Sequence, residues 1–362
     1  LSLVINGYDD GKSTGVLRSF IPGMLGPSDF RKNSNNFCKN PNLKFLLDHR
    51  IKTNNFLFIK NFLLDPLSAS KNLNKQDLKI KKYLLLTTLD ESNKIFESFK
   101  FFFNYQSKVR KNINMFDCSI GNIVFSGLYL KNQKKFNKTV EEYNNLCGSN
   151  VKIYNVSNGL NAYLYGIDST NKILDNEEKI VNLPKNKYLK EIFLLKKKIQ
   201  NPRIEYLRKN QFNPDMNADL KKILLNSDVI IYGPGTQFSS LLPSYLTKNI
   251  GKYISINKQA LKVFVSNIKL DNDIQSLSVN DIFDKSFFYL NNKGKTKIDK
   301  NKLFKNLLIQ KSQDNVFNKN FENYLNFNID TLNFDKKKVH TDNWEKSSGK
   351  HLGEFFHNYI IK

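Results

Sequence analysis

The chain has few cysteines and no long apolar segment. A membrane-spanning helix needs about 20 mostly apolar residues, and no such run occurs in the 362 residues. No secretory signal pattern is present. The three cysteines, Cys38, Cys118 and Cys147, are widely spaced and odd in number, which argues against a disulfide framework. These features predict a cytoplasmic protein with reduced thiols and no membrane partner.

Histidine is also scarce, and this limits the metal chemistry that the sequence supports. The four histidines, His49, His340, His351 and His357, are scattered along the chain, and no cysteine pair has the spacing of zinc ligands. No dedicated transition-metal site is therefore predicted. No Ser-His-Asp or Cys-His set is evident either, so the sequence does not indicate a hydrolase of those types.

Acidic residues are the minority among the charged ones. Lys and Arg number 57 against 33 Asp and Glu, which gives a formal charge of +24. A basic chain suggests a nucleic-acid partner, but lysine runs such as 196–198 and 336–338 are dispersed, and lysine occurs throughout with Asn, Ile, Phe and Tyr. We interpret these runs as solvated surface and expect no nucleic-acid partner, and nucleic-acid binding stays as an alternative. Phe101–Phe103 is expected to pack a helix end rather than to stack on bases.

The pattern of apolar residues predicts an α/β protein with a parallel sheet. Short apolar runs at 1–5, 228–232 and 263–265 indicate strands, and helical spacing indicates helices over 42–62 and 77–103. Short β-prone runs separated by Asn, Gly, Asp and Pro occupy about 151–200 and predict an antiparallel insertion. Beyond about residue 285 the pattern predicts only a mixed peripheral tail.

The densest group of ionisable and glycine residues follows the first apolar run. Asp9 and Asp10 stand at the carboxyl end of a predicted strand, which is where open α/β sheets bind ligands. Two carboxylates there suit a magnesium ion, an acceptor hydroxyl, or both. The alternative is that one aspartate caps a turn and the other faces water. Residues of the same segment that suit phosphate or substrate contacts are Gly11, Lys12, Ser13, Thr14, Arg18, Ser28, Asp29 and Arg31. Arg18 and Arg31 suit either a phosphate or a structural pair with Asp29.

Two further motifs have the form of anion sites. Gly233-Pro234-Gly235-Thr236 lies between a predicted strand and a predicted helix, where backbone N–H groups face an anion; the alternative is a tight turn without a ligand. Asn122 follows Gly121 at a helix start that Ser119 is placed to cap. Its side chain suits a phosphate, a base, or merely nearby backbone groups. Neither motif is a Walker loop, and together the parts suit phosphoryl-type transfer.

Four blocks taken together resemble the 2-phospho-L-lactate transferase family. They are residues 6–15, 25–33, 119–122 and 233–236, the last followed by Leu242-Pro243, and their order and spacing agree over about residues 1–271. The resemblance implies an α/β, Rossmann-like three-layer core with a parallel central sheet and an inserted, partly antiparallel subdomain. We expect a family domain at 1–275 with the β-rich insertion at 151–200, and a mixed extension at 276–362 packed on the core.

The resemblance also implies a reaction. In the transferase branch a phospholactyl group moves from a guanosine diphosphate-linked donor to a deazaflavin hydroxyl, with Mg2+, and GMP is released. By analogy Asp9 and Asp10 serve the metal and the acceptor, and Arg31 joins them as a catalytic residue. The implied substrate and nucleotide contacts are Gly11, Ser13, Thr14, Ser28, Asp29, Asn122, Gly233, Gly235 and Thr236. A homodimer is expected.

The same family offers a rival function and shows two departures. Its gluconeogenesis-factor branch binds UDP-sugars, so a non-catalytic regulator is the main alternative. The family normally begins with a strand and a Gly-Gly loop facing the nucleotide, and we expect this element to lie before Leu1. Lys12 stands where the family often carries a second glycine, which alters the acceptor pocket or adds a phosphate contact.

Overall fold

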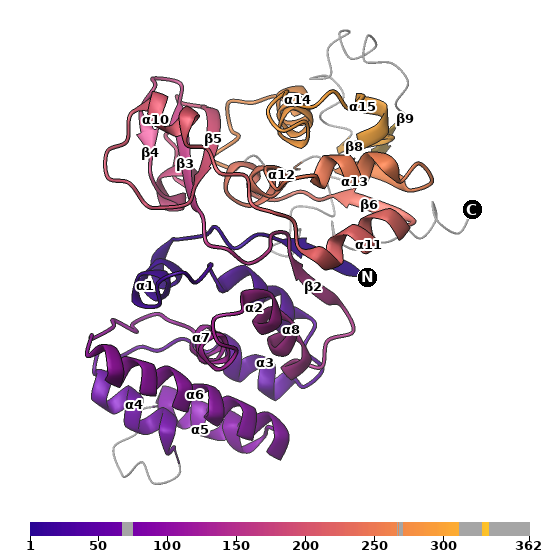
Figure 1. Ribbon diagram of the computed structural model, residues 1–362. Helices are drawn as coiled ribbons and strands as arrows, with labels where there is room; N and C mark the ends of the chain where they lie inside the picture. The colour runs from indigo at the N-terminus through magenta and orange to yellow at the C-terminus, as the bar shows by residue number, and fades with distance from the viewer. Residues whose placement is uncertain (67–74, 266, 268–270, 311–327, 333–362) are drawn as a thin grey trace. The chain divides into compact units, whose positions relative to one another are not determined.

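The computed structural model describes residues 1–66, 75–265, 267, 271–310 and 328–332 (Figure 1). The chain forms two compact units. The first consists of Leu1–Ile223, Thr236–Ile250 and Asp271–Ser276, and the second of Leu224–Gly235, Gly251–Leu270 and Leu277–Lys362. The predicted boundary between residues 275 and 276 concerned a family domain and its extension, and it stays a prediction.

Helices dominate the first half of the first unit. Strands β1 (Ser2–Ile5) and β2 (Lys152–Asn155) pair in parallel. The helices between them are α1 (Lys12–Phe20), α2 (Ser28–Asn36), α3 (Pro41–Asp48), α4 (Phe56–Leu64), α5 (Lys75–Leu85), α6 (Leu89–Val109), α7 (Ile120–Lys131) and α8 (Phe136–Leu146). Parallel strands require a long crossover, and here the whole helical layer forms that crossover.

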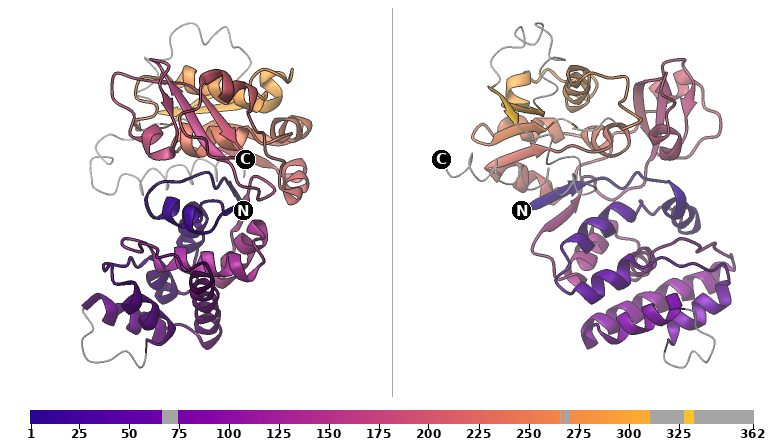
Figure 2. Two further views of the ribbon diagram at one scale, coloured as in Figure 1. Left: turned by 60° about the vertical axis from the view of Figure 1, so that its left-hand side comes forward. Right: turned by 180° about the vertical axis from the view of Figure 1, so that it is seen from behind.

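The core of this helical layer lies along α6. Helix α4 packs on α6 and α5 packs on α3, and Figure 2 shows the helical layer from two further sides. Phe102 and Phe103 of α6 are buried, whereas Phe101 is 39% exposed. Helix α7 packs so closely on α6 that a Cβ at Gly127 would lie 2.0 Å from the Ser98 carbonyl oxygen. The prediction that the Phe101–Phe103 run packs a helix is therefore confirmed for Phe102 and Phe103.

Each of the two long predicted helices is divided into two separate helices in the structure. The segment 42–62 contains the end of α3 and the start of α4, where the Asn55 side chain accepts a hydrogen bond from the Phe58 amide at 3.0 Å. The segment 77–103 is divided between α5 and α6 by a capping box, in which Thr88 and Glu91 satisfy each other's backbone N–H groups. The prediction of single helices was wrong because apolar spacing continued across residues that cap a new helix.

A small antiparallel sheet follows β2 in the same unit. Its order is β4-β3-β5, with β3 (Tyr163–Asp168), β4 (Ile173–Leu174) and β5 (Leu189–Leu195), and it is accompanied by α9 (Glu177–Val181) and α10 (Ile204–Lys209). This confirms the predicted antiparallel subdomain. The prediction was wrong for residues 152–155, because β2 pairs in parallel with β1, and a short β-prone run carries no signal of strand direction.

The second unit contains a parallel sheet of order β6-β7-β8-β9. Its strands are β6 (Val229–Tyr232), β7 (Leu261–Val265), β8 (Asn306–Gln310) and β9 (Asn328–Leu332), and its helices include α14 (Val279–Leu290) and α15 (Lys300–Leu303). The prediction of a peripheral tail beyond residue 285 is wrong for β8 and β9, which continue the sheet. The predicted strand at 228–232 is confirmed as β6, in which Ile231 is 46% exposed.

The remaining helices connect these parts of the chain. Helix α11 (Ala218–Asn226) precedes β6, and a helical segment η1 (Gln237–Leu241), α12 (Leu242–Tyr245) and α13 (Ile250–Ile256) lie between β6 and β7. Parallel strands joined by helices make the chain an α/β protein with a Rossmann-like fold, as predicted.

Candidate active site

The loop after β1 is anchored before it reaches the two aspartates. Asn6 is buried, and its side-chain amide donates to the backbone oxygen of Ser240 and, at 2.9 Å, to the hydroxyl of Ser244. The Asn6 side-chain oxygen accepts from the Tyr8 amide at 3.1 Å. These contacts fix the loop to η1 and α12, so that the positions of Asp9 and Asp10 are set by buried groups.

Arg18 of α1 holds the same loop from its other side. Its guanidinium is buried and donates to the backbone oxygens of Tyr8 and Asp9 at 2.8 Å and to that of Ala162 at 2.7 Å. Burial lowers the pKa of Arg18, opposed by the charge of Asp10. The sequence left two predicted roles open for Arg18, a phosphate ligand or an ion-pair partner of Asp29. In the structure its N–H groups instead donate to backbone oxygens of the active-site loop, which is a third role.

Asp9 forms a turn at the start of α1. Its carboxylate accepts a hydrogen bond from the Gly11 amide at 2.7 Å, as in the capping alternative. Lys12 follows with a φ of 41°, a left-handed conformation that favours glycine. Gly15 is required by close approach, since a Cβ there would lie 2.2 Å from the Asp10 carbonyl oxygen. The backbone of this loop thus fixes where both aspartates point.

Glu177, at the start of α9, is the third carboxyl group of the site. Its backbone amide donates to an Asp10 oxygen at 2.9 Å. Burial raises the pKa of Glu177 to about 9, aided by a hydrogen bond to the Asp9 carboxyl and by the Asp9 charge. At neutral pH the Glu177 carboxyl group therefore keeps its proton and is hydrogen-bonded to Asp9. Such a pair is where a cation can replace the proton.

Asp10 faces a cavity of about 540 Å³. Its carboxylate is only 7% exposed, and its second oxygen lies 3.4 Å from the Lys198 ammonium. Lys12 and Lys111 also line the cavity, and Phe20 and Tyr163 contribute rings to its wall. Arg18 lines it too, so the arrangement places one buried carboxylate beside four cations and two aromatic rings, which suits a small ligand with both charged and apolar parts.

Three of the predicted substrate residues meet in a buried network. The hydroxyls of Thr14 and Ser28 are hydrogen-bonded to each other, and the Asn122 side-chain amide donates to Ser28 at 3.2 Å. The side-chain oxygen of Asn122 is buried and has no hydrogen-bond partner. Asn122 is placed by Ser119, whose hydroxyl accepts from its backbone amide as predicted. An unpaired buried oxygen of this kind is unusual and points to a ligand or to an ordered water.

These features agree with the comparisons to known proteins. The sequence profile described as 2-phospho-L-lactate transferase CofD matches residues 1–349. The chain belongs to this family. Two crystal structures of protein BH3568 from Bacillus halodurans, one described as a member of the UPF0052 family, share its fold at 16% sequence identity and a TM-score of 0.62. The match covers 97% of this chain in both comparisons, and 91% of the first BH3568 chain and 90% of the second. No curated protein matches the chain significantly.

Two other predicted residues of the CofD-family motif have partners that the sequence did not indicate. Arg31 is buried and pairs with Asp48 at 2.6 Å rather than with Asp29. Asp29 lies 3.5 Å from Lys32, and burial raises the pKa of Asp29, opposed by Lys32. Ser13 is partly exposed in the first turn of α1. Their predicted roles toward substrate stay predictions.

The Gly-Pro-Gly-Thr turn is divided between the two units. Gly233 and Gly235 belong to the second unit, where the Asn267 side chain donates to the Gly235 oxygen at 2.8 Å. Thr236 belongs to the first unit and precedes η1. One amide of that helical start, Phe238, donates to the Asp273 carboxylate at 2.9 Å. Burial raises the pKa of Asp273 to about 6. A carboxylate of the chain itself thus already binds one backbone amide at the helix start that was expected to face a phosphate.

Glu177 and Lys198 were missed by reasoning from the sequence. Both lie in the antiparallel subdomain, and no local motif distinguishes Glu177 from Glu178 or Lys198 from Lys197. Only the folded chain brings them to Asp9 and Asp10.

Among the described residues, no group of three or more His, Cys, Asp and Glu side chains is arranged to bind one metal ion. None of the described helices is long and apolar enough to span a membrane.

Proposed function

We propose that this protein transfers a phosphoester group from a nucleoside diphosphate-linked donor to the hydroxyl of an acceptor, as a 2-phospho-L-lactate transferase does. Family membership supports the reaction class. The single observation that carries the proposal is the buried Asp10 carboxylate, which lines a cavity of about 540 Å³ next to the Asp9–Glu177 carboxyl pair. A cavity of this size is within the range of small-molecule sites.

Asp10 is the proposed base for the acceptor. One of its oxygens is fixed by the Glu177 amide, and the other lies near Lys198. The acceptor oxygen forms a bond to the distal phosphorus of the donor, and its proton passes to Asp10. The bridging P–O bond breaks, and the nucleoside monophosphate leaves with the electron pair. The rings of Tyr163 and Phe20 suit a planar acceptor such as a deazaflavin.

The lysines of the cavity neutralise the charge of the phosphate. Lys12, Lys111 and Lys198 line the same space as Asp10. Charge that develops on phosphate oxygens is stabilised by cations already in place, which is the main source of catalysis in phosphoryl transfer. Lys12 thus adds a phosphate contact at a position where the family often has glycine.

Magnesium is the proposed cofactor, held by Asp9 and Glu177. The fit rests on the position of the two carboxyl groups, since a Cβ at Gly11 would lie 3.3 Å from a Glu177 oxygen and 3.4 Å from an Asp9 oxygen. A divalent cation can therefore be shared by both carboxylates. Magnesium commonly takes one or two protein carboxylates and completes its shell with phosphate oxygens and water. When bound, it would neutralise the donor phosphates. Asp9 was a predicted ligand, Glu177 is added here, and Asp10 is reserved for the acceptor.

The donor nucleotide is proposed to contact the Thr14, Ser28 and Asn122 network. The unpartnered Asn122 oxygen would accept a hydrogen bond from a base or ribose. Thr236 of the first unit remains a proposed contact for the donor phosphates, and the roles of Gly233 and Gly235 stay predictions. This division gives the donor and the acceptor separate groups of residues.

A transferase assay tests the proposed function. With a guanosine diphosphate-linked phospholactate and a hydroxylated deazaflavin, the protein should release GMP, and Asp10→Asn should lower the rate roughly a hundredfold because the base is lost. Asp219→Asn, an exposed acid in the first turn of α11, should not change the rate. Wild-type turnover in Asp10→Asn would contradict the role of Asp10. Stabilisation by UDP-N-acetylglucosamine with no GMP release would instead favour a regulator.

A further inference from the structure

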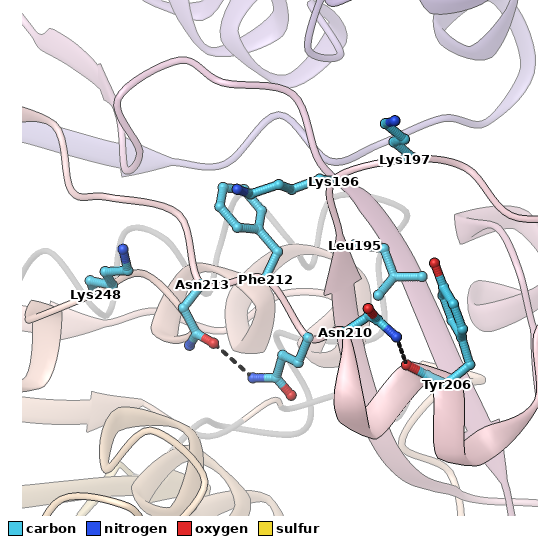
Figure 3. Close-up of a pocket in the computed structure, with 9 residues that line it drawn as sticks. Leu195, Lys196, Lys197, Tyr206, Asn210, Phe212, Asn213 and Lys248 are labelled. Atoms are coloured by element: carbon cyan, nitrogen blue, oxygen red, sulfur yellow. Dashed lines mark hydrogen bonds between the residues drawn. The ribbon is translucent and has the colours of Figure 1, made fainter.

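A second cavity lies in the first unit, and its lining is separate from the residues of the proposed active site. Its volume is about 480 Å³, and it lies between the end of β5, helix α10 and the following loop (Figure 3). None of its lining residues lines the Asp10 cavity. The two cavities nevertheless share one run of chain, because Lys196 and Lys197 line this one and Lys198 lines the other.

The lining of the second cavity is basic. It contains Lys196, Lys197 and Lys248, and no aspartate or glutamate is among the described residues that line it. Lys248 pairs with Asp215 at 2.8 Å, but both side chains are more than half exposed, so this pair is weak. The three lysines are exposed, and the lining therefore presents an excess of positive charge to solvent, which favours an anion.

Aromatic and amide groups complete the wall. The Lys196 ammonium lies 5.0 Å from the centre of the Phe212 ring and reaches over its face (Figure 3). Tyr206 contributes a second ring that is 41% exposed. Asn210 and Gln211 add side-chain amides. Rings of this kind stack on planar heterocycles, and amides bind the polar edges of such heterocycles.

Hydrogen bonds to backbone oxygens outside the lining hold the residues of the cavity in place. The Phe212 amide donates to the Leu194 oxygen at 2.7 Å, and the Asn213 side chain donates to the Leu246 oxygen at 2.7 Å. The Lys248 amide donates to the Pro214 oxygen at 2.8 Å. A preformed pocket of this kind loses less entropy when a ligand binds.

We propose that this second cavity binds a nucleoside monophosphate, or a compound with the same two parts, a planar heterocycle and a phosphate. Tyr206 and Phe212 contact the heterocycle, and Lys196 and Lys248 contact the phosphate. A purely inorganic anion would leave the rings unused, and a neutral ring compound would leave the excess positive charge unused. The site does not depend on the proposed transferase reaction, since it contains neither Asp9, Asp10 nor Glu177.

Photolabelling of the full chain tests this site. We would irradiate the protein with an azido-substituted adenosine monophosphate and map the labelled peptides. We expect label within residues 204–213. Lys196→Glu and Tyr206→Ala should each weaken binding of the probe about tenfold, which is the loss expected from one charged or stacking contact.

Matched variants separate a built site from general attraction to a basic protein. Lys209→Glu changes the charge by the same amount on the exposed end of α10, outside the cavity, and should bind as the wild type does. Equal weakening by Lys196→Glu and Lys209→Glu, or label only outside residues 204–213, would overturn the proposal. Competition by inorganic phosphate as strong as that by adenosine monophosphate would also overturn it, because the rings would then contribute nothing. Unfolding midpoints of the variants exclude misfolding as the cause.

Discussion

At the scale of single residues, the active site depends on one buried guanidinium. Arg18 donates to the backbone oxygens of Tyr8, Asp9 and Ala162. Its side chain is 4% exposed. A charge this deep is tolerated because several oxygens satisfy it. The sequence placed Arg18 near the aspartates but gave no reason to choose backbone oxygens over phosphate as its partners.

Replacing Arg18 by Lys should therefore destabilise the fold. A lysine ammonium is a single point and cannot reach both groups of oxygens, so buried acceptors are left unpaired. We expect a loss of about 2 to 3 kcal/mol in the free energy of unfolding, measured with urea. Arg208→Lys, in the last turn of α10, should stay within about 0.5 kcal/mol of the wild type. Equal stability of the two variants would contradict the anchoring role.

Lys262 of β7 is a second buried cation, and it predicts a pH effect. Its side chain is 1% exposed and donates to the Lys302 oxygen at 2.6 Å. Burial lowers the pKa of Lys262 from 10.5 to about 8, and Lys305 adds to the shift. Between pH 8 and pH 10.5 the unfolded chain thus binds more protons than the native one, so the contribution of Lys262 to stability rises with pH.

Lys262→Met should remove this pH dependence. The difference in unfolding free energy between wild type and Lys262→Met should shift in favour of the wild type by on the order of 2 to 3 kcal/mol from pH 7 to pH 10.5. Comparing the two proteins at each pH cancels the titration of the other groups. A constant difference over this range would show that Lys262 titrates normally in the fold.

At the scale of elements, α6 shows how far apolar spacing can be used. The run Phe101–Phe103 was expected to pack, and two of its rings are buried. The break between α5 and α6 was missed because Thr88 and Glu91 interrupt no apolar stripe, although they form a capping box. Strand direction was equally hidden at residues 152–155, since pairing with β1 is set by tertiary structure.

Two phenylalanines of α6 form a matched pair for measurement. Phe102→Ala removes a fully buried ring and should cost about 3 to 5 kcal/mol of unfolding free energy. Phe101→Ala removes a ring that is 39% exposed and should cost about 1 kcal/mol or less. Urea unfolding of both variants measures the two losses in unfolding free energy. A larger loss for Phe101→Ala would contradict the packing of this helix.

At the scale of the whole molecule, the sequence predicted the order of the motifs but not which distant residues contact them in the fold. Four blocks of sequence indicated the family and its Rossmann-like fold, and both are confirmed. The Asp9–Glu177 pair was not predicted, because Glu177 lies in the insertion, far along the chain from the first loop. The hydrogen bond from the Glu177 amide to Asp10 joins residues 167 positions apart. The strands β8 and β9 were also missed, since neither five-residue run shows a strict alternation of apolar and polar side chains.

The most direct test of the proposed site is a magnesium titration of GMP release in wild type, Glu177→Gln and Glu178→Gln. Glu177 hydrogen-bonds to Asp9, whereas Glu178 is its exposed neighbour on α9. We expect Glu178→Gln to match the wild type, and Glu177→Gln to need at least about tenfold more magnesium for half-maximal rate, because one ligand is lost. Identical titrations of all three proteins would contradict the assignment of Asp9 and Glu177 as the metal site.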